Sequence, residues 1–144
     1  MKIRVVWIGK TKDAHITALV EDYIGRIRRF LPVEITELKD GRSAGEKLAA
    51  SLDAGDRVVL LDPDGKPWTS DQLAEFVRQH MNTDSRRLTF VIGGPSGFDK
   101  DFKKRAPHLW SLSPLTFTHD MTRMLLMEQI YRALTIIHNH PYPR

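Results

Sequence analysis

The chain contains no cysteine among its 144 residues. Disulfide bonds, thiolate nucleophiles and cysteine-ligated zinc are therefore excluded, and the composition is compatible with a reducing compartment. No run of about 18 apolar residues occurs, so no membrane-spanning helix is expected. The first apolar stretch, MKIRVVWIGK, is too short for a signal peptide and is interrupted by Arg4, which favours a strand. These absences predict a cytoplasmic protein.

Internal repeats, low-complexity stretches and linkers are also absent. A length of 144 residues favours one compact domain, residues 1–144, and an apolar fraction of 41% is sufficient for a packed core. The net charge of +4 permits contact with a polyanion such as nucleic acid, although many basic proteins bind none.

Strand and helix patterns alternate along the chain. Strands are predicted at 2–8, 33–38, 57–61, 88–92 and 109–112, and helices at 16–30, 43–54, 70–81, 99–105 and 121–137. A Ser-x-x-Glu capping box, Ser43 and Glu46, opens the second helix, and the turn Asp62-Pro63-Asp64-Gly65 ends the third strand. This alternation predicts an α/β fold with a mostly parallel sheet and helices on both faces.

A glycine-rich segment, Gly93-Gly94-Pro95-Ser96-Gly97, directly follows the strand at 88–92. Loops at the carboxyl ends of strands bind ligands in open α/β sheets, and glycines let a ligand approach the backbone closely. The spacing is not G-x-G-x-x-G, and Pro95 removes one N–H that a phosphate cradle would use. A neutral or zwitterionic ligand is therefore favoured over a dinucleotide or nucleoside triphosphate. A plain turn is an equally weighted alternative.

A second apolar loop, residues 112–117, leads to the last predicted helix. Apolar walls with backbone N–H and C=O groups suit an adenine ring, although the segment taken alone is better explained as a buried connection. His119 stands just before the helix, with Asp120 and Thr122 as alternative capping residues. A neutral imidazole there could accept a proton or orient a base, whereas a lone histidine near a helix start is more often structural.

Two arginines of the last helix, Arg123 and Arg132, are nine residues apart and lie on opposite helix faces. This helix alone therefore cannot direct both of them to one site within one chain. Glu128 precedes Arg132 by four residues, the favourable order for a helix salt bridge, and that is the simpler explanation of Arg132.

The chain ends in His138-Asn139-His140-Pro141-Tyr142-Pro143-Arg144. The two histidines lack an evident third ligand, so no metal site is expected. Aromatic, amide and cationic groups in such a tail could instead close over a base by stacking and hydrogen bonding.

Two basic clusters could contact RNA phosphate, although a solvated helix face is the more common meaning of such clusters. They are Arg26, Arg28 and Arg29, and Lys100, Lys103, Lys104 and Arg105.

The segments VIGGPSG, WSLSPLTFTHDMTRMLLMEQIYRA and the terminal HPY resemble the ribosomal RNA large subunit methyltransferase H family of the SPOUT class. The resemblance runs along the whole chain and includes KIRVVWIGK and LLDPDGKPW. It implies a C-terminal trefoil knot, a homodimer and S-adenosylmethionine as methyl donor, with no metal. The implied substrate is N3 of a pseudouridine in 23S rRNA within the assembled ribosome.

The resemblance also implies which residues form the site. The donor would be bound by Leu61, Gly93, Leu112, Ser113, Pro114, Leu115, Thr116 and Phe117. His119, Arg132 and Tyr142 match family positions linked to substrate binding or catalysis. Pro143 stands where the family commonly has a histidine, so the group that accepts the proton stays open. Two other functions stay open as well: a non-catalytic RNA-binding or ribosome-associated domain, and a methyltransferase of the same class that acts on another RNA such as tRNA.

Overall fold

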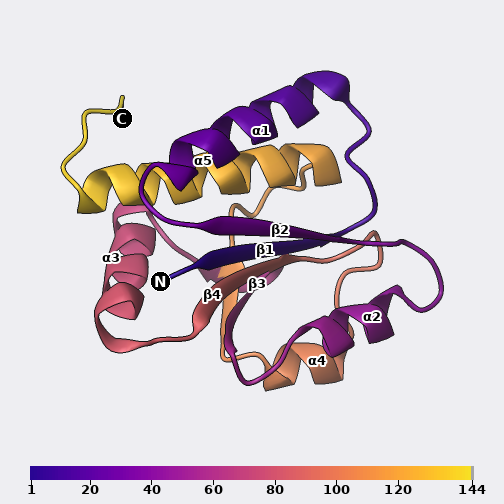
Figure 1. Cartoon of the computed structure of the whole chain (residues 1–144). Coiled ribbons are helices and arrows are strands. Elements are labelled where there is room, and N and C mark those ends of the chain that lie inside the picture. The colour runs from indigo at the N-terminus through magenta and orange to yellow at the C-terminus, as the bar shows by residue number, and fades with distance from the viewer. Residues whose placement is uncertain (144) are drawn as a thin grey trace.

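The structure, a computed structural model, describes residues 1–143, in which strands and helices alternate along the chain (Figure 1). The strands are β1 (Ile3–Ile8), β2 (Val33–Leu38), β3 (Asp56–Pro67), β4 (Arg87–Ile92) and β5 (His108–Ser111). The helices are α1 (Ala14–Arg28), α2 (Ala44–Ser51), α3 (Ser70–Thr83), α4 (Lys100–Arg105) and α5 (His119–Ile137). Among the described residues, no helix is both long and apolar enough to cross a membrane.

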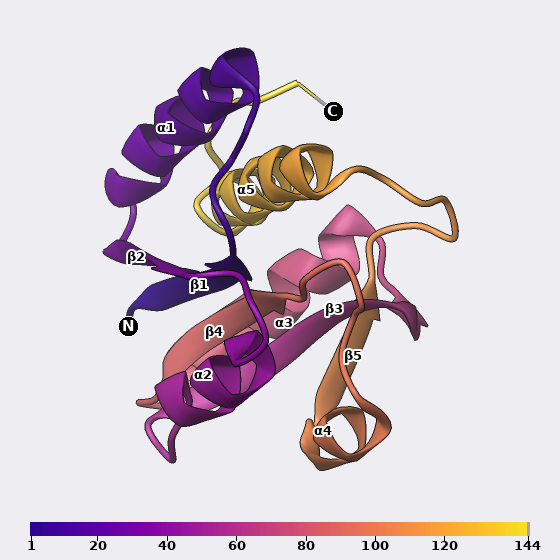
Figure 2. The same ribbon diagram turned by 90° about the vertical axis from the view of Figure 1, so that its right-hand side faces the viewer.

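The strands form one sheet in the order β2-β1-β4-β3-β5, and every pair is parallel. Helices cover both faces: α1 and α5 lie on one side of the sheet, and α2 and α4 lie on the other (Figure 2). The larger core, on the α5 side, includes side chains of α1, α3 and α5, and a smaller one lies beneath α2 and α4. The predicted α/β fold with a parallel sheet is thereby confirmed.

The central strands are buried on both faces because both layers of helices pack on them. β4 shows this in the run Leu88, Thr89, Phe90, Val91 and Ile92, all buried. Such a run, apolar except for Thr89, whose hydroxyl donates to Asp56 at 2.7 Å, is the pattern expected of a parallel strand covered on both sides. All five carboxyl ends consequently meet at one edge of the sheet, where the loops that follow the strands gather.

The predicted capping box of α2 was wrong. Ser43 makes no side-chain hydrogen bond to the first turn, and the helix ends at Ser51 rather than at residue 54. Asp53 explains the early end, because its carboxylate accepts the N–H of Gly55 at 2.6 Å and shapes a turn before β3. Side-chain bonding of this kind competes with the helix for the local backbone.

The predicted end of the third strand was also wrong. β3 continues to Pro67, and Leu61 and Lys66 both pair with Trp110 of β5. Residues 62–65 leave the pairing of β3 with β5, and the strand resumes this pairing at Lys66; we call this segment the excursion of β3. Gly65 is required there, since a Cβ on it would lie 2.6 Å from the backbone carbonyl carbon of Leu109. The turn chemistry was recognised correctly, but it bends the strand instead of ending it.

Candidate functional site

A cavity of about 270 Å³ lies beside residues 61–63 of β3, where the excursion begins, and the carboxyl ends of β4 and β5. The lining includes nearly all the residues expected to hold the donor: Leu61, Gly93, Leu112, Ser113, Leu115, Thr116 and Phe117. Pro114 lies in the same loop but does not line the cavity. His119 does line it. The structure therefore brings together residues more than 50 positions apart in the sequence, at the edge where open α/β sheets bind ligands.

The glycine loop forms one wall of this donor pocket, as we call the cavity from here on. Gly97 adopts a positive φ of 69°, and its N–H donates to the Gly94 carbonyl at 2.9 Å. A Cβ on Gly93 would meet the Phe98 ring at 3.2 Å. Gly93 thus makes room for Phe98, which itself lines the pocket, and its effect on a ligand would pass through that ring.

The loop at 112–117 forms the opposite wall and is stiffened by its own hydrogen bonds. The Ser111 hydroxyl donates to the Ser113 carbonyl at 3.0 Å, and the Leu115 N–H donates to the Ser113 hydroxyl at 3.0 Å. The Leu115 side chain is 70% exposed. The segment is therefore an open, apolar loop with ordered backbone, rather than the buried connection that was the alternative.

The start of α5 is fixed by Thr118, a cap that the sequence analysis missed. Its hydroxyl accepts the Met121 N–H at 3.2 Å, so neither Asp120 nor Thr122 is the capping residue. Asp120 instead accepts the N–H of Asp13 at 2.9 Å and ties α5 to the loop after β1. His119 is exposed at this anchored helix start and faces the pocket.

Arg123 reinforces the same anchor from the buried side of α5. Its guanidinium donates to the Ile8 carbonyl at 2.8 Å and to the Thr11 hydroxyl at 3.0 Å, and it lies 4.9 Å from the centre of the Trp7 ring. Burial lowers the pKa of Arg123 from its ordinary value. With only 3% of its surface exposed, Arg123 joins α5 to β1 and is not available to a ligand.

An acidic side chain not foreseen as part of the site, Asp62, also lines the donor pocket. It is nearly buried, and the Lys103 ammonium lies 3.1 Å from its carboxylate and 3.0 Å from that of Asp64. These hydrogen bonds raise the pKa of Lys103. The ion pairs join α4 to the excursion of β3 and hold two walls of the pocket together.

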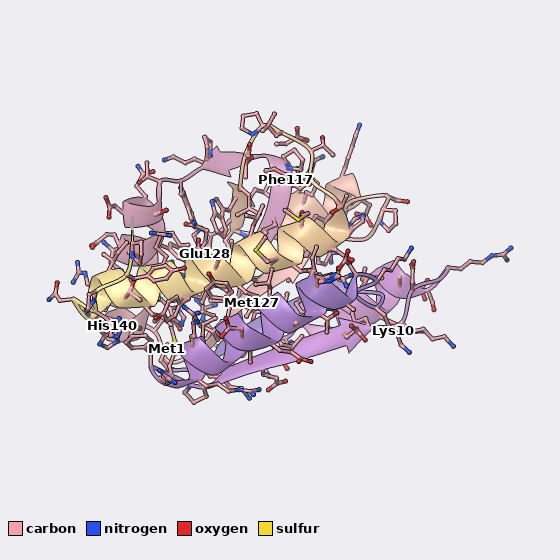
Figure 3. All side chains as sticks on the ribbon, turned by 90° about the horizontal axis from the view of Figure 1, so that it is seen from above. Met1, Lys10, Phe117, Met127, Glu128 and His140 are labelled. Atoms are coloured by element: carbon pink, nitrogen blue, oxygen red, sulfur yellow. The ribbon has the colours of Figure 1, made fainter. Side chains whose placement is uncertain are left out.

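The remaining predicted site residues, Arg132 and Tyr142, lie at the far end of α5. From His119 to Arg132 the helix rises about 20 Å at roughly 1.5 Å per residue. Figure 3 shows Phe117 beside the first turns of α5 and His140 beyond its last turn, at opposite ends of the helix. One chain therefore does not bring these two residues to its own donor pocket.

A network around Glu128 holds the tail. Arg132 donates to the Glu128 carboxylate at 2.9 Å, which confirms the expected helix salt bridge. The Tyr142 hydroxyl lies 2.9 Å from both Glu128 and the Tyr23 hydroxyl, and the Arg132 guanidinium stacks 4.7 Å from the Tyr142 ring. Burial, followed by the hydrogen bonds to Tyr23 and Glu128, raises the pKa of Tyr142 above its ordinary value. Tyr142 is therefore a neutral phenol at physiological pH.

The two tail histidines contact Phe30 of the turn after α1. His138 stacks on that ring at 4.9 Å, and His140 meets it edge-on at 5.8 Å. Within residues 1–143, no three His, Cys, Asp or Glu side chains are grouped where they could hold a metal ion.

The donor pocket has the chemistry that a nucleoside ligand needs. Leu61, Ile92 and Phe117 supply apolar walls, and the glycine loop and Ser113 supply backbone groups and a hydroxyl. Its volume of about 270 Å³ lies just below the range of roughly 300–1,000 Å³ for small-molecule sites. The side chain of Asp62 is the carboxylate at its edge, and no phosphate cradle with G-x-G-x-x-G spacing is present in the glycine loop.

Comparison with known proteins agrees with this architecture. A crystal structure of a probable methyltransferase from Bordetella pertussis Tohama I matches with a TM-score of 0.56 and 11% identity, over 92% of this chain and 95% of that chain, and supports the fold alone. The ribosomal RNA large subunit methyltransferase H of Trichlorobacter lovleyi is 43% identical over 151 aligned positions, covering 99% of each chain. The corresponding protein of Geobacter sulfurreducens is 40% identical with the same coverage. A family model described as "Predicted SPOUT methyltransferase" matches residues 1–143. The chain therefore belongs to the SPOUT methyltransferase family.

Proposed function

We propose that this protein is an S-adenosylmethionine-dependent methyltransferase that modifies N3 of a pseudouridine in 23S rRNA on the assembled ribosome. The observation that carries the proposal is the donor pocket, in which Leu61, Gly93 and the loop at 112–117 converge at the carboxyl edge of a SPOUT fold. The relatives named ribosomal RNA large subunit methyltransferase H support an rRNA substrate. The pseudouridine and the ribosome follow from the family resemblance, as does a cytoplasmic location for a single domain.

The residues that line the donor pocket have separate tasks in this proposal. The apolar walls and the backbone groups of the loop at 112–117 hold the adenine, and the glycine loop allows close approach of the rest of the molecule. The donor supplies an electrophilic methyl group on a sulfonium. Asp62, nearly buried in the pocket lining, is ion-paired with Lys103, so its task is to hold the pocket walls together.

The positions of Arg132 and Tyr142 support a homodimer. Arg132 lies about 20 Å along α5 from His119, given roughly 1.5 Å of rise per residue, and Tyr142 packs against Arg132. They therefore complete a donor pocket only if it belongs to a second copy. The exposed face of α5 near Met121, which is 37% exposed, together with the 70% exposed Leu115, offers apolar surface for that copy. The trefoil knot implied by the family would lie in the loops that line the donor pocket.

The chemistry demands removal of a proton from N3 and stabilisation of the negative charge that develops. A partner's guanidinium at position 132 would supply the stabilisation, since a fixed cation in a dry site acts strongly on developing charge. Its ion pair with Glu128 orients that guanidinium. Alignment of nitrogen, methyl carbon and sulfur supplies much of the remaining rate enhancement. His119, at the donor pocket, is positioned to contact the incoming base.

The test is transfer of a labelled methyl group to intact bacterial ribosomes, with free 23S rRNA and tRNA as comparison substrates. We expect ribosomes to be the preferred substrate and the product to be N3-methylpseudouridine. Transfer to tRNA alone would indicate a different RNA substrate. Calorimetry with S-adenosylmethionine runs in parallel: absence of both donor binding and transfer would leave an RNA-binding domain without catalysis.

A further inference from the structure

Many solvent-accessible cations of the fold differ in whether a carboxylate pairs with them. Those at the amino edge of the sheet and on α3 are engaged with carboxylates. The pairs are Lys2–Glu34, Arg78–Glu75 at 2.5 Å, Arg86–Asp84 at 2.8 Å and Arg87–Asp56 at 3.0 Å. Of the two basic clusters expected from the sequence, the one on α1 is engaged only in part, since Arg26 pairs with Asp22 and Arg28 donates to the Val33 carbonyl, whereas Arg29 is exposed and has no ion pair within residues 1–143.

Cations around the carboxyl edge are different. We use the name rim cations for Lys10, Lys39, Arg42, Lys100 and Arg105, which follow β1, β2 and β4 or lie on α4. All five are exposed, and within residues 1–143 no carboxylate lies within ion-pair distance of any of them. Figure 3 shows Lys10 at the end of the molecule opposite to Met1 and His140.

Most carboxylates of the same rim accept hydrogen bonds from N–H groups of the protein itself or pair with its cations. Asp13 accepts the His15 N–H, Asp99 the Phe102 N–H and Asp120 the Asp13 N–H, at 2.8, 2.8 and 2.9 Å. Asp62 faces Lys103. Glu46 and Asp101 make no such contact among the described residues, so the rim is mixed in sign. The charged groups of the rim that lack a partner are nevertheless mainly cations, because most of its carboxylates have a hydrogen-bond or ion-pair partner within the protein and the five rim cations have no carboxylate partner.

Two rim cations line a groove beside the donor pocket. Arg42 and Arg105 stand at a hollow of about 560 Å³ between α2 and α4, whose shared wall with the donor pocket includes Gly94, Gly97 and Phe98. Asp40, Glu46 and Asp99 line the same hollow, and two of these carboxylates accept backbone N–H groups: Asp40 that of Gly41 and Asp99 that of Phe102. The helices that line this groove, α2 and α4, lie on the face of the sheet opposite α5 (Figure 2). A dimer formed through α5 would leave it open.

We propose that the rim cations bind phosphates of the rRNA on either side of the nucleotide that enters the donor pocket, with Arg42 and Arg105 holding the strand at the groove. This inference rests on the proposed function and adds the surface by which the substrate is held. Unpaired guanidinium and ammonium groups gain by replacing counterions on phosphate, and this term depends on charge but not on base sequence. Ion-paired arginines gain less, because binding must first break an existing pair.

The test compares Arg42→Gln/Arg105→Gln with a charge-matched control, Arg78→Gln/Arg86→Gln, in the full-length protein. Binding to intact bacterial ribosomes is measured at several salt concentrations by filter retention, and S-adenosylmethionine affinity by calorimetry. Each lost phosphate contact should reduce the slope of log K against log salt by about 0.7–0.9. We expect such a reduction, with weaker binding at low salt, for the groove variant alone, and unchanged donor affinity in both variants.

Equal slopes for the wild type and the groove variant would overturn the proposal. So would equal losses in both double variants, which would reflect net charge alone. Because the readout is binding, it stays informative if methyl transfer fails: a wild type that binds ribosomes through the groove but transfers no methyl group would contradict the proposed function and leave this surface intact.

Discussion

Replacement of Gly65 by alanine should destabilise the protein and disturb the donor pocket from a distance. The added Cβ would lie 2.6 Å from the Leu109 carbonyl carbon and 2.6 Å from the Trp110 nitrogen, both backbone atoms of β5. Neither can rotate away, so β3 and β5 must separate. Overpacking of this kind costs about 1–3 kcal/mol in the free energy of unfolding. The loop at 112–117 directly follows β5, so donor affinity should fall as well.

The expected shift in melting temperature follows from the chain length. At about 2.1 cal/mol/K per residue, the unfolding entropy of 144 residues is about 0.3 kcal/mol/K, so each kcal/mol lowers the midpoint by about 3 °C. Gly65→Ala should therefore melt about 3–10 °C below the wild type. The matched control is Gly25→Ala in α1, where a Cβ meets nothing within 4 Å. There alanine should stabilise by about 0.5–1 kcal/mol, because glycine is unfavourable within a helix.

Calorimetric melting at one fixed protomer concentration measures both variants, because any oligomerisation makes the midpoint depend on concentration. The reasoning is refuted if Gly65→Ala melts within about 1.5 °C of the wild type, half the shift that about 1 kcal/mol should produce. It is equally refuted if both variants shift in the same direction by the same amount.

Three further changes test other parts of the site and fold. Gly93→Val should abolish S-adenosylmethionine binding in calorimetry by displacing Phe98 into the donor pocket, and unchanged affinity in a folded variant would contradict this. Removing residues 142–144 should leave donor affinity within a few-fold while severely lowering ribosome methylation at saturating donor; equal rates would show that the tail is dispensable. Burial lowers the pKa of His80, so below about pH 6.5 the unfolded chain binds a proton at this imidazole that the folded protein does not bind. The free energy of unfolding should therefore fall as the pH drops below about 6.5. His80→Gln should flatten that fall in urea midpoints between pH 7.5 and 5.5, and an unchanged slope would assign the effect to other groups.

The sequence was sufficient for features that depend on local periodicity. β2 and β4 appeared nearly at their observed bounds, and the i, i+4 spacing of Glu128 and Arg132 correctly predicted their salt bridge. The family resemblance identified the two loops that meet at the donor pocket. From their residues alone, the glycine loop could equally have been a plain turn, and the loop at 112–117 was better explained as a buried connection.

Features that depend on distant contacts were not predictable. The return of β3 to its ladder after Asp62 depends on pairing with β5, about 45 positions later, and no local signal reports that pairing. The hydrogen bond between Tyr23 and Tyr142 joins residues at the two ends of the chain. The ion pairs of Asp62 with Lys103 likewise arise only after α4 packs beside the excursion. Local turn chemistry was recognised, but its consequence depends on what the rest of the fold brings beside it.

The most direct test of the central claim, that the donor pocket and Arg132 form one catalytic site across a dimer, is a mixing experiment. Gly93→Val and Arg132→Ala subunits are each inactive in the proposal, but a heterodimer carries one intact pocket facing one intact Arg132. Methyl transfer to ribosomes by purified, differently tagged heterodimers should recover to roughly half the wild-type rate, because one of two sites is whole. If verified heterodimers transfer no more methyl than either parent variant, each site is built within one chain and the account is contradicted.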